Sequence, residues 1–461
     1  MIEHTATHHA THHATHHATH HAPDQASNQA QSARDAACSR RDFVKTSAAL
    51  SAAAALAPGA LAFATRRNAS EVLRIGVIGC GGRGTGAAVD ALDAHPATRI
   101  VALADLYLDR VNSSLENLLG VERAKARIDV PEAHRFHGFD ACRRLLALKD
   151  VDYVILATPP GFRPSHFEAA INAGKHVFME KPVAVDPAGV RRVLAASDEA
   201  DRKGLCVVAG TQRRHHALYQ DIIQRVHDGQ IGEVLSANCY WNQGGLWVHN
   251  RRPEYTDMEW QTRNWLYFTW LSGDHICEQH VHNLDVINWA MQATPVKCIG
   301  MGGRQVRTGP EYGNIFDHFA VEYEYANGVR MVSMSRQIDG CDNRVEEFLR
   351  GTKGSAHTNH GSARLEGPGL AWRYSGKAEN PYVVEHRDLI DAITSSTRVN
   401  EARTVAESTL TAIMGRMSAY SGQAITWEAA LKSPLDLTPL ALDFGQLPVE
   451  AVAVPGKTRY V

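Results

Sequence analysis

The stretch that most constrains the fold begins with an apolar, β-branched run at Val72–Ile78. It leads directly into the glycine-rich loop Gly79–Gly84, with the sequence GCGGRG, and a helix-like stretch follows over 85–94. A glycine turn between a strand and a helix brings bare backbone and a helix N-terminus together, where a phosphate can bind. The stretch therefore predicts the first unit of a dinucleotide-binding Rossmann domain.

The glycines of this loop have separate uses in a phosphate-binding turn. Gly79 permits the tight turn, Gly81 lets the backbone approach a pyrophosphate, and Gly84 allows the helix to pack closely. The helix N-terminus attracts the phosphate charge. The residues expected to hold this part of the cofactor are Gly79, Gly81, Gly82, Arg83 and Gly84.

An acidic residue stands where such a domain would contact the adenosine ribose. Asp105 follows a second strand-like run at 99–104, and its carboxylate would accept hydrogen bonds from the ribose hydroxyls. A carboxylate there repels a 2′-phosphate, so Asp105 favours NAD(H) over NADP(H). Arg110 lies nearby and could offset this preference.

The alternation of strands and helices continues along the chain. Apolar runs at 152–157, 176–179 and 205–209 are typical of strands, and helices are expected over 164–173 and 187–202. The order predicts a doubly wound parallel sheet, with ligands at the carboxyl ends of its strands. The residues after these strands, which we expect near the nicotinamide, are Thr158, Pro159, Glu180, Lys181 and Gln212.

The tripeptide Glu180-Lys181-Pro182 is the most telling motif. With the glycine loop and Asp105, it makes the chain resemble the glucose–fructose oxidoreductase, inositol dehydrogenase and MocA (Gfo/Idh/MocA) family over about 71–428. The resemblance implies that Lys181 hydrogen-bonds the reacting hydroxyl and that the Lys181–Pro182 bond is cis. The chemistry agrees, because an ammonium beside a bound cofactor can stabilise an alkoxide as its proton leaves.

The second half of the chain is expected to form an α+β domain over 213–432. Strand-like runs at 234–241, 319–325 and 329–335 are interrupted by helical segments, and a helix is expected over 400–423. The resemblance implies an open, mostly antiparallel sheet. Family members use one face of that sheet for subunit contacts and the other for substrate, so a homodimer or homotetramer is expected.

An acid-histidine segment in this half supplies the expected catalytic groups. Glu278, His282 and Asp285 keep the family's spacing, although the family usually has aspartate where this chain has Glu278. Separations of three or four residues put side chains on one helical face, so the three could converge on substrate. We expect His282 to be the general base, because imidazole titrates near neutral pH, and Glu278 to orient it.

A metal site is the competing interpretation of this segment. His275, Glu278, His280, His282 and Asp285 offer five possible ligands within eleven residues. No HExxH or comparable zinc pattern is present, and hydride transfer assisted by a lysine needs no metal. We therefore predict no metal, and buried structural roles stay open for His275 and His280.

Aromatic and polar residues elsewhere in this half are candidates for the sugar pocket. Flat apolar surfaces mixed with hydrogen-bonding groups are common in such sites, although core packing explains each tryptophan equally well. The candidate substrate-binding residues are Arg213, Trp241, Asn242, Asn264, Trp265 and Asp285.

The amino terminus indicates export. Residues 1–38 are low-complexity and rich in paired histidines, which suits a solvated tail better than a defined metal site. Residues 39–64 resemble a twin-arginine signal, with Arg40-Arg41 before a mildly apolar run. Pro58 and Gly59 argue against a stable membrane span. We expect the twin-arginine machinery to deliver the protein to the periplasm or another extracytoplasmic space.

Composition and charge leave small-molecule chemistry as the main expectation. The formal net charge is −2, so a nucleic-acid partner is not predicted. The chain should divide into 1–38, 39–64, a dinucleotide-binding domain at 71–212, a substrate and oligomerisation domain at 213–432, and an arm at 433–461.

The predicted function is oxidation or reduction of a sugar or cyclitol hydroxyl by an exported NAD(P)-dependent oxidoreductase. An envelope compartment holds no nicotinamide dinucleotide pool, so the cofactor should be tightly bound. One alternative is an NAD-dependent glycoside hydrolase or lyase that oxidises its sugar transiently. A second is a non-catalytic sugar sensor, against which the pairing of Lys181 with His282 argues.

Overall fold

The computed structural model describes residues 72–395 and 397–459. The predicted histidine-rich extension and twin-arginine segment lie outside the described residues.

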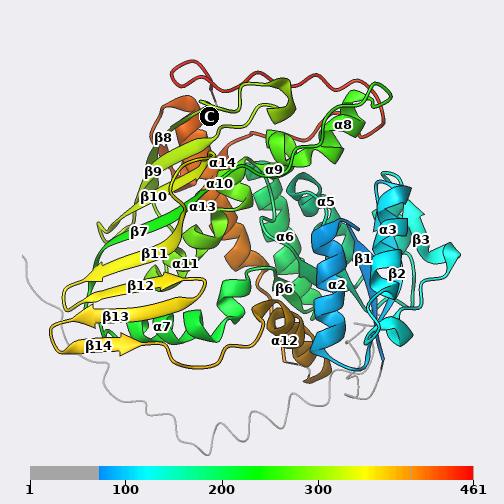
Figure 1. Cartoon of the computed structure of the whole chain (residues 1–461), viewed down its shortest axis with the longest axis horizontal. Coiled ribbons are helices and arrows are strands. Elements are labelled where there is room, and N and C mark those ends of the chain that lie inside the picture. The colour runs from blue at the N-terminus through cyan, green and yellow to red at the C-terminus, as the bar shows by residue number, and fades with distance from the viewer. Residues whose placement is uncertain (1–71, 396, 460–461) are drawn as a thin grey trace, which may run out of the picture. The chain divides into compact units, whose positions relative to one another are not determined.

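The first half of the described chain forms a six-stranded parallel sheet in the order β3-β2-β1-β4-β5-β6 (Figure 1). Its strands are β1 (Leu73–Ile78), β2 (Thr98–Asp105), β3 (Arg135–His137), β4 (Tyr153–Leu156), β5 (His176–Met179) and β6 (Val207–Ala209). The order reverses direction between β1 and β4, as in a doubly wound fold. The predicted parallel sheet is confirmed, and only the short strand β3 was not expected.

Both faces of this sheet are covered by helices, because alternate side chains of each strand enter different cores. In β1, Ile75 and Val77 face one core and Ile78 faces the other. The helices on the first face are α2 (Gly82–Ala94), α3 (Leu108–Leu119) and α12 (Pro381–Ser395). Those on the second face are α4 (Ala141–Leu146), α5 (Arg163–Asn172) and α6 (Pro187–Lys203).

Helix α6 shows how local sequence sets these boundaries. Asp186 caps its first turn by accepting a hydrogen bond from the Gly189 N–H at 2.7 Å, and Pro187 occupies the first helical position. Gly204 ends the helix at φ 68°, a left-handed conformation that glycine adopts without strain. The helix predicted over 187–202 is therefore confirmed.

The second sheet has nine strands in the order β14-β13-β12-β11-β7-β10-β9-β8-β15, and only the β7–β10 pair is parallel. Its strands are β7 (Val234–Gln243), β8 (Lys297–Gly303), β9 (His318–Glu324), β10 (Arg330–Gln337), β11 (Arg344–Gly351), β12 (Ser355–Asn359), β13 (Ser362–Gly367), β14 (Leu370–Arg373) and β15 (Ile425–Thr426). The predicted mostly antiparallel sheet is confirmed.

Helices cover one face of this second sheet and leave the other open (Figure 1). The remaining helices are α7 (Ala217–His227), α8 (Asp257–Arg263), α9 (Thr269–Ser272), α10 (His275–Glu278), α11 (Val281–Met291), α13 (Ala402–Ser421) and α14 (Trp427–Lys432). Helix α13 also packs against α6, so the helix predicted over 400–423 does contact the cofactor domain. Ile299, Met301 and Met334 are exposed on the open face.

Helices α12 and α13 join the two sheets. Leu389 and Ile390 of α12 enter the core of the parallel sheet, although 213–432 was assigned to the second domain. Before α13, Glu401 accepts a hydrogen bond from the Ala209 N–H at 2.8 Å. His215 Nδ1 lies 2.5 Å from the Asp388 carboxylate, and its Nε2 lies 3.3 Å from Glu401. His215 therefore ties the end of the parallel sheet to both helices.

This histidine predicts a pH-dependent stability. Burial lowers the pKa of His215, but its hydrogen bond to Asp388 and the nearby Glu401 carboxylate outweigh burial and raise the pKa to about 10. A raised histidine pKa stabilises the fold below the unfolded value, about 6.5, and this stabilisation is lost as pH rises through about 10. His215→Gln should cost on the order of 1–3 kcal/mol at neutral pH, since Asp388 is partly solvent-screened. Urea unfolding of the unmodified protein and of His215→Gln across this pH range measures the difference in unfolding free energy. A difference that does not change with pH contradicts the prediction.

Candidate active site

The glycine loop has the shape of a phosphate cradle. A Cβ on Gly84 would lie 1.8 Å from the Gly79 carbonyl oxygen, and Gly79 has φ +99° with the backbone of 157–158 close behind it. A Cβ on Gly81 or Gly82 would meet nothing within 4 Å. Helix α2 starts at Gly82 without a side-chain cap, so its first N–H groups remain available. The loop therefore fits a pyrophosphate above Gly81 and Gly82.

Asp105 lies beside this loop at the end of β2. Its carboxylate accepts hydrogen bonds from the N–H groups of Cys80 at 2.7 Å and Tyr107 at 3.0 Å. Burial raises its pKa, while these two N–H groups and the Arg110 charge oppose the rise. Each carboxylate oxygen keeps a free lone pair, so Asp105 can still receive ribose hydroxyls.

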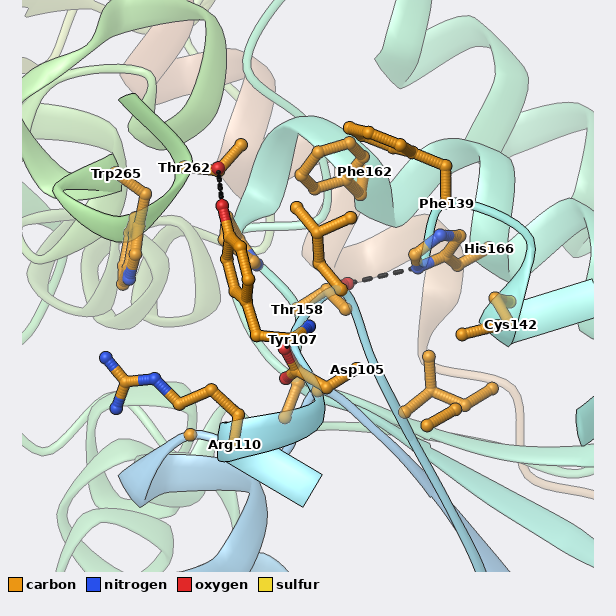
Figure 2. A pocket seen from close by; sticks show the side chains of 18 of the residues that line it. Asp105, Tyr107, Arg110, Phe139, Cys142, Thr158, Phe162, His166, Thr262 and Trp265 are labelled. Atoms are coloured by element: carbon orange, nitrogen blue, oxygen red, sulfur yellow. Dashed lines mark hydrogen bonds between the residues drawn. The ribbon is translucent and has the colours of Figure 1, made fainter. Parts of the chain in front are cut away.

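A cavity of about 570 Å³ opens between the glycine loop, Asp105 and the second half of the chain (Figure 2). Its predicted members include Arg110, Thr158 and Pro159, and Thr158 is hydrogen-bonded to His166 at 3.1 Å. Many of its walls are aromatic, and the rings that were not expected at the cofactor are Tyr107, Phe139, Phe162 and Trp247. No local pattern links these rings, because loops from distant parts of the chain bring them together.

Arg83 links the glycine loop to the turn after β5. It forms ion pairs with Glu180 and, at 3.3 Å, with the buried carboxylate of Glu385, and its guanidinium lies 4.8 Å from the Tyr382 ring centre. Gln212 donates to the Tyr382 hydroxyl at 3.3 Å. Arg83, Glu180 and Gln212 thus converge on one cluster, as expected of residues at the carboxyl edge of the sheet.

Arg163 holds the turns after β4 and β5 in place. This buried guanidinium donates to the carbonyl oxygens of Thr158 and Glu180, and to that of Pro182 at 3.3 Å. The Lys181–Pro182 bond is cis, as the family resemblance implied. Arg163 was not predicted, because a single arginine at a helix start belongs to no motif.

Lys181 reaches across to the acid-histidine segment. Its Nζ donates to the Glu278 carbonyl oxygen at 2.6 Å and lies 3.2 Å from the Glu278 carboxylate. An ammonium has three N–H donors, so one remains for another acceptor. Within the described residues Glu278 contacts Lys181 and makes no hydrogen bond to His282, the partner predicted for it.

The single helical face predicted for Glu278, His282 and Asp285 is wrong. Helix α10 ends at Glu278, and α11 begins at Val281. The intervening residues are held by tertiary contacts: Gln279 bonds two other glutamines, and His280 donates to or accepts from the Ser333 hydroxyl at 2.7 Å. These contacts override the helical spacing.

His282 nonetheless faces Trp241. The two rings are stacked, with centres 5.8 Å apart and planes 22° apart. Burial lowers the pKa of His282 well below its ordinary value, and the charges of Lys181 and Arg213 lower it further. His282 is therefore neutral at neutral pH and able to accept a proton.

Asp285 does not join this group. Arg214 binds its carboxylate with two hydrogen bonds of 2.8 and 2.9 Å, and the Ser408 hydroxyl adds a third at 2.7 Å. The side chain is 2% exposed, so protein groups occupy it. Its structural role in joining α11 to α13 replaces the substrate contact that the spacing suggested.

The other substrate candidates separate into different places. Arg213 pairs with buried Glu347 and lies over the Trp241 ring, close to His282. Asn242 follows Trp241 on β7, and neighbouring strand residues point to opposite faces, so it lies on the open face of the sheet. That position contradicts a role for Asn242 beside His282.

Asn264 and Trp265 lie near the dinucleotide cavity instead. Asn264 is fully buried, donates to the Glu311 carbonyl at 2.7 Å and accepts from the His249 N–H at 2.9 Å, so its amide is used structurally. Trp265 lines the cavity (Figure 2). Neither Lys181 nor His282 lines that cavity, so the structure does not bring these two substrate candidates together with the expected catalytic pair.

A chain of amides that the sequence did not reveal supports Trp241. The indole N–H donates to Gln243 at 2.9 Å, and both Gln243 and Gln337 donate to the Gln279 side-chain oxygen at 3.0 and 2.5 Å. Arg307 donates to Gln337 at the far end. The Trp241 indole and the Arg307 guanidinium at the two ends of this chain can only donate, so the orientation of each glutamine amide between them is fixed. The Gln279 NH₂ group then has no partner among the described residues.

The histidines of the competing metal interpretation are buried or engaged. Neither His275 nitrogen has a hydrogen-bond partner, and burial lowers its pKa. Across 72–395 and 397–459, no group of three or more His, Cys, Asp or Glu side chains could hold a metal ion. No helix in the same part of the chain is long and apolar enough to cross a membrane.

The fold and the glycine loop define a dinucleotide-binding Rossmann domain joined to a second domain with a mostly antiparallel sheet. A model of the oxidoreductase family with an NAD-binding Rossmann fold matches residues 73–211, and the GFO/IDH/MocA C-terminal domain matches 219–357. The chain belongs to the Gfo/Idh/MocA family. Residues 37–57 match the twin-arginine translocation pathway signal, which confirms the predicted export and extracytoplasmic location.

Relatives in this family have several activities. A dTDP-3,4-didehydro-2,6-dideoxy-alpha-D-glucose 3-reductase of Actinomadura kijaniata is 30% identical over 36% of this chain and 44% of its own. An inositol 2-dehydrogenase of Pseudomonas fluorescens is 28% identical over 56% of this chain and 66% of its own. A glycosyl hydrolase family 109 protein of Streptomyces coelicolor is 25% identical over 67% of this chain and 63% of its own.

The matched region spans about half the length of the first of these relatives. Among solved structures, the aldose-aldose oxidoreductase of Caulobacter crescentus has a TM-score of 0.60 at 20% identity, covering 77% of this chain and all of that one. This likeness concerns the fold.

Proposed function

We propose that the protein is an exported sugar or cyclitol oxidoreductase that keeps its NAD(H) bound. The observation that carries this proposal is Lys181, whose ammonium lies at the carboxyl edge of the glycine-loop sheet with one N–H unused, near the neutral imidazole of His282. The inositol dehydrogenase and sugar reductase among the relatives support the substrate class.

The two groups can divide the work on one hydroxyl. When bound, the nicotinamide supplies the hydride acceptor or donor. Lys181 donates its remaining N–H to the hydroxyl oxygen and stabilises negative charge there. This makes the hydroxyl proton more acidic, so His282 can accept it although burial makes that imidazole a weak base. Trp241 forms a flat wall against His282 that suits a sugar ring.

This division predicts how His282 affects the pH profile. His282→Ala should lower kcat by roughly 10²–10⁴-fold and leave dinucleotide affinity unchanged. Since the pKa of His282 lies well below 6.5, the acid limb of kcat/KM should fall below that value. A pH profile of kcat and kcat/KM, measured with a sugar on which the protein acts, checks both expectations. An acid limb above pH 6.5 that persists in His282→Ala contradicts the role assigned to His282.

We also propose NAD(H) over NADP(H), because the carboxylate of Asp105 lies where a 2′-phosphate would sit. Arg110 lines the same cavity and makes no side-chain hydrogen bond among the described residues, so its charge favours NADP(H). Identification of the nucleotide released by denatured protein decides between them.

The second candidate function is redox-neutral glycoside cleavage, favoured by the glycosyl hydrolase family 109 relative that matches 67% of this chain. Oxidation of a sugar carbon by the bound dinucleotide would acidify a neighbouring C–H, and elimination would release the aglycone. Addition of water and re-reduction of the same carbon would then return both the sugar and the dinucleotide to their starting redox states. Lys181 and His282 serve this chemistry as well, so the site alone does not separate the two functions.

One experiment separates these functions. Purified protein receives sugars, cyclitols and aryl glycosides without added cofactor, while nicotinamide absorbance and aglycone release are followed. If the protein is an oxidoreductase, a free sugar or cyclitol should cause a lasting change in the nicotinamide absorbance. Aglycone release without lasting absorbance change supports cleavage, and ligand binding without either signal supports a sensor.

We further propose a homodimer or homotetramer built on the open face of the second sheet. Ile299 and Met301 are 53% and 74% exposed there, beside Met334. Apolar side chains of this size on an open sheet face are typical of a buried subunit contact. The mass of the protein in solution tests this proposed assembly. Met301→Glu is expected to lower that mass.

A further inference from the structure

The last segment of the chain runs past the dinucleotide cavity. After α14, residues 433–459 contain no helix or strand. The Leu437 N–H donates to the buried Asp186 carboxylate at 2.8 Å, which fixes the segment beside the start of α6. We call residues 433–459 the C-terminal arm.

The middle of the arm forms part of the cavity wall. Leu442 lines the cavity. The Phe444 ring lies 5.0 Å from Phe139 and 5.9 Å from Tyr107, measured between ring centres, and both of those residues line the same cavity. Leu442 and Phe444 are still 40% and 47% exposed, so they have apolar surface left to bury against a ligand.

Helix α8 anchors the arm on the far side of this contact. The Leu447 N–H donates to the Asp257 carboxylate at 3.1 Å, and the Gln261 amide donates to the Leu447 carbonyl at 2.6 Å. The Met258 N–H donates to the Gly445 carbonyl at 3.2 Å. Hydrogen bonds on both sides thus hold Leu442 at the cavity wall and Phe444 against Phe139 and Tyr107.

Helix α8 is itself fastened to the cofactor domain. Thr262 lies 2.5 Å from the Tyr107 hydroxyl (Figure 2), and Arg263 pairs with Asp109 at 3.0 Å and lies over the Tyr107 ring. Tyr107 follows Asp105 by two residues. The arm and α8 therefore close the side of the cavity beyond the ribose-binding carboxylate.

We infer that Leu442 and Phe444 complete the adenine-nucleoside end of the dinucleotide site. The inference rests on the proposed dinucleotide binding. A ribose on Asp105 would carry its base toward Tyr107 and Phe139, and an adenine has the flat apolar faces that such rings and Phe444 accommodate. Release of the dinucleotide then requires the arm to leave the cavity, which keeps the cofactor bound outside the cell.

The test compares dinucleotide release from three arm variants. Phe444→Ser removes the ring that packs on Phe139 and Tyr107, and Leu442→Ser removes apolar surface from the cavity wall, whereas Leu440→Ser changes a fully exposed leucine of the same arm. NADH is loaded onto each protein, and its loss of fluorescence is followed after dilution into an NADH-consuming scavenger. We expect release roughly tenfold faster in Phe444→Ser, a smaller increase in Leu442→Ser, and none in Leu440→Ser.

Binding of half-ligands locates the effect. Phe444→Ser should weaken AMP and leave nicotinamide mononucleotide unchanged, since only AMP carries the adenine. Equal release rates in all three variants, or equal acceleration in Leu440→Ser, would overturn the inference. Urea unfolding of each variant shows that the fold is intact. Failure of the unmodified protein to bind NADH would instead overturn the proposed function.

Discussion

Gly84→Ala is expected to destabilise the protein and abolish dinucleotide binding. The added Cβ would lie 1.8 Å from the Gly79 carbonyl oxygen and 3.2 Å from the Ala157 Cβ, and a backbone oxygen cannot move without displacing the loop. Forcing α2 away from β1 should cost about 1–3 kcal/mol or more of unfolding free energy. It also moves the N–H groups that face the phosphate. Urea unfolding and NADH titration measure the two effects.

Gly81→Ala is the matched control for this prediction. Gly81 has φ −73°, which alanine adopts freely, and its Cβ would meet no protein atom within 4 Å. The fold should be unaffected, but the methyl group would occupy the space assigned to the pyrophosphate, so affinity should fall by roughly tenfold or more. Unchanged affinity in Gly81→Ala would place the phosphate elsewhere and contradict the assignment of the loop.

Lys181→Met should reduce turnover by roughly 10²–10⁴-fold while dinucleotide affinity changes little. Methionine keeps most of the side-chain volume and removes the ammonium that we assign to the reacting oxygen. Glu278 then loses its partner, so unfolding must be measured to exclude a general loss of structure. Stopped-flow absorbance of the bound nicotinamide gives the rate of the hydride step directly.

Glu278→Gln separates the two members of this pair. Its amide oxygen can still accept from Lys181, and the Glu278 backbone carbonyl, 2.6 Å from the ammonium, is retained. A loss much smaller than that of Lys181→Met is expected. Equal losses would indicate that Lys181 acts mainly by holding Glu278, and full activity in Lys181→Met would remove Lys181 from the chemistry.

The parallel sheet was predictable because its signals are local. The run into Gly79–Gly84 carries strand, turn and helix within about twenty residues, and the predicted strands and helices as far as 209 lie within a few residues of those observed. Strand β3 was missed, since three residues are too few to show a pattern. The antiparallel sheet came from the family resemblance.

The site was less predictable, because tertiary contacts decide it. The spacing of Glu278, His282 and Asp285 suggested one helix, but Gln279 and His280 bond to other elements and break it. Asp285 is taken by Arg214, which no local pattern links to it. Because neighbouring residues of a strand point to opposite faces of the sheet, Asn242 could be placed on the other face from Trp241 once the strand was known.

Contacts between segments that lie far apart in the chain could not be predicted from the sequence. Arg163 acts through backbone carbonyls, which have no sequence signature. Phe444 lies more than 300 residues from Phe139 and Tyr107 along the chain, yet it packs against both. Such positions follow from the path of the arm rather than from the composition around them.

We expect the exported protein to carry a dinucleotide in the cleft of the glycine loop. The most direct measurement is to recover the mature protein from the extracytoplasmic fraction, denature it, and quantify the nicotinamide dinucleotide released per chain. A stoichiometric amount is expected, mainly NAD(H), and exported Gly84→Ala protein should release none. Folded, exported protein that releases no dinucleotide and binds none when it is added would show that the glycine loop is not a dinucleotide site.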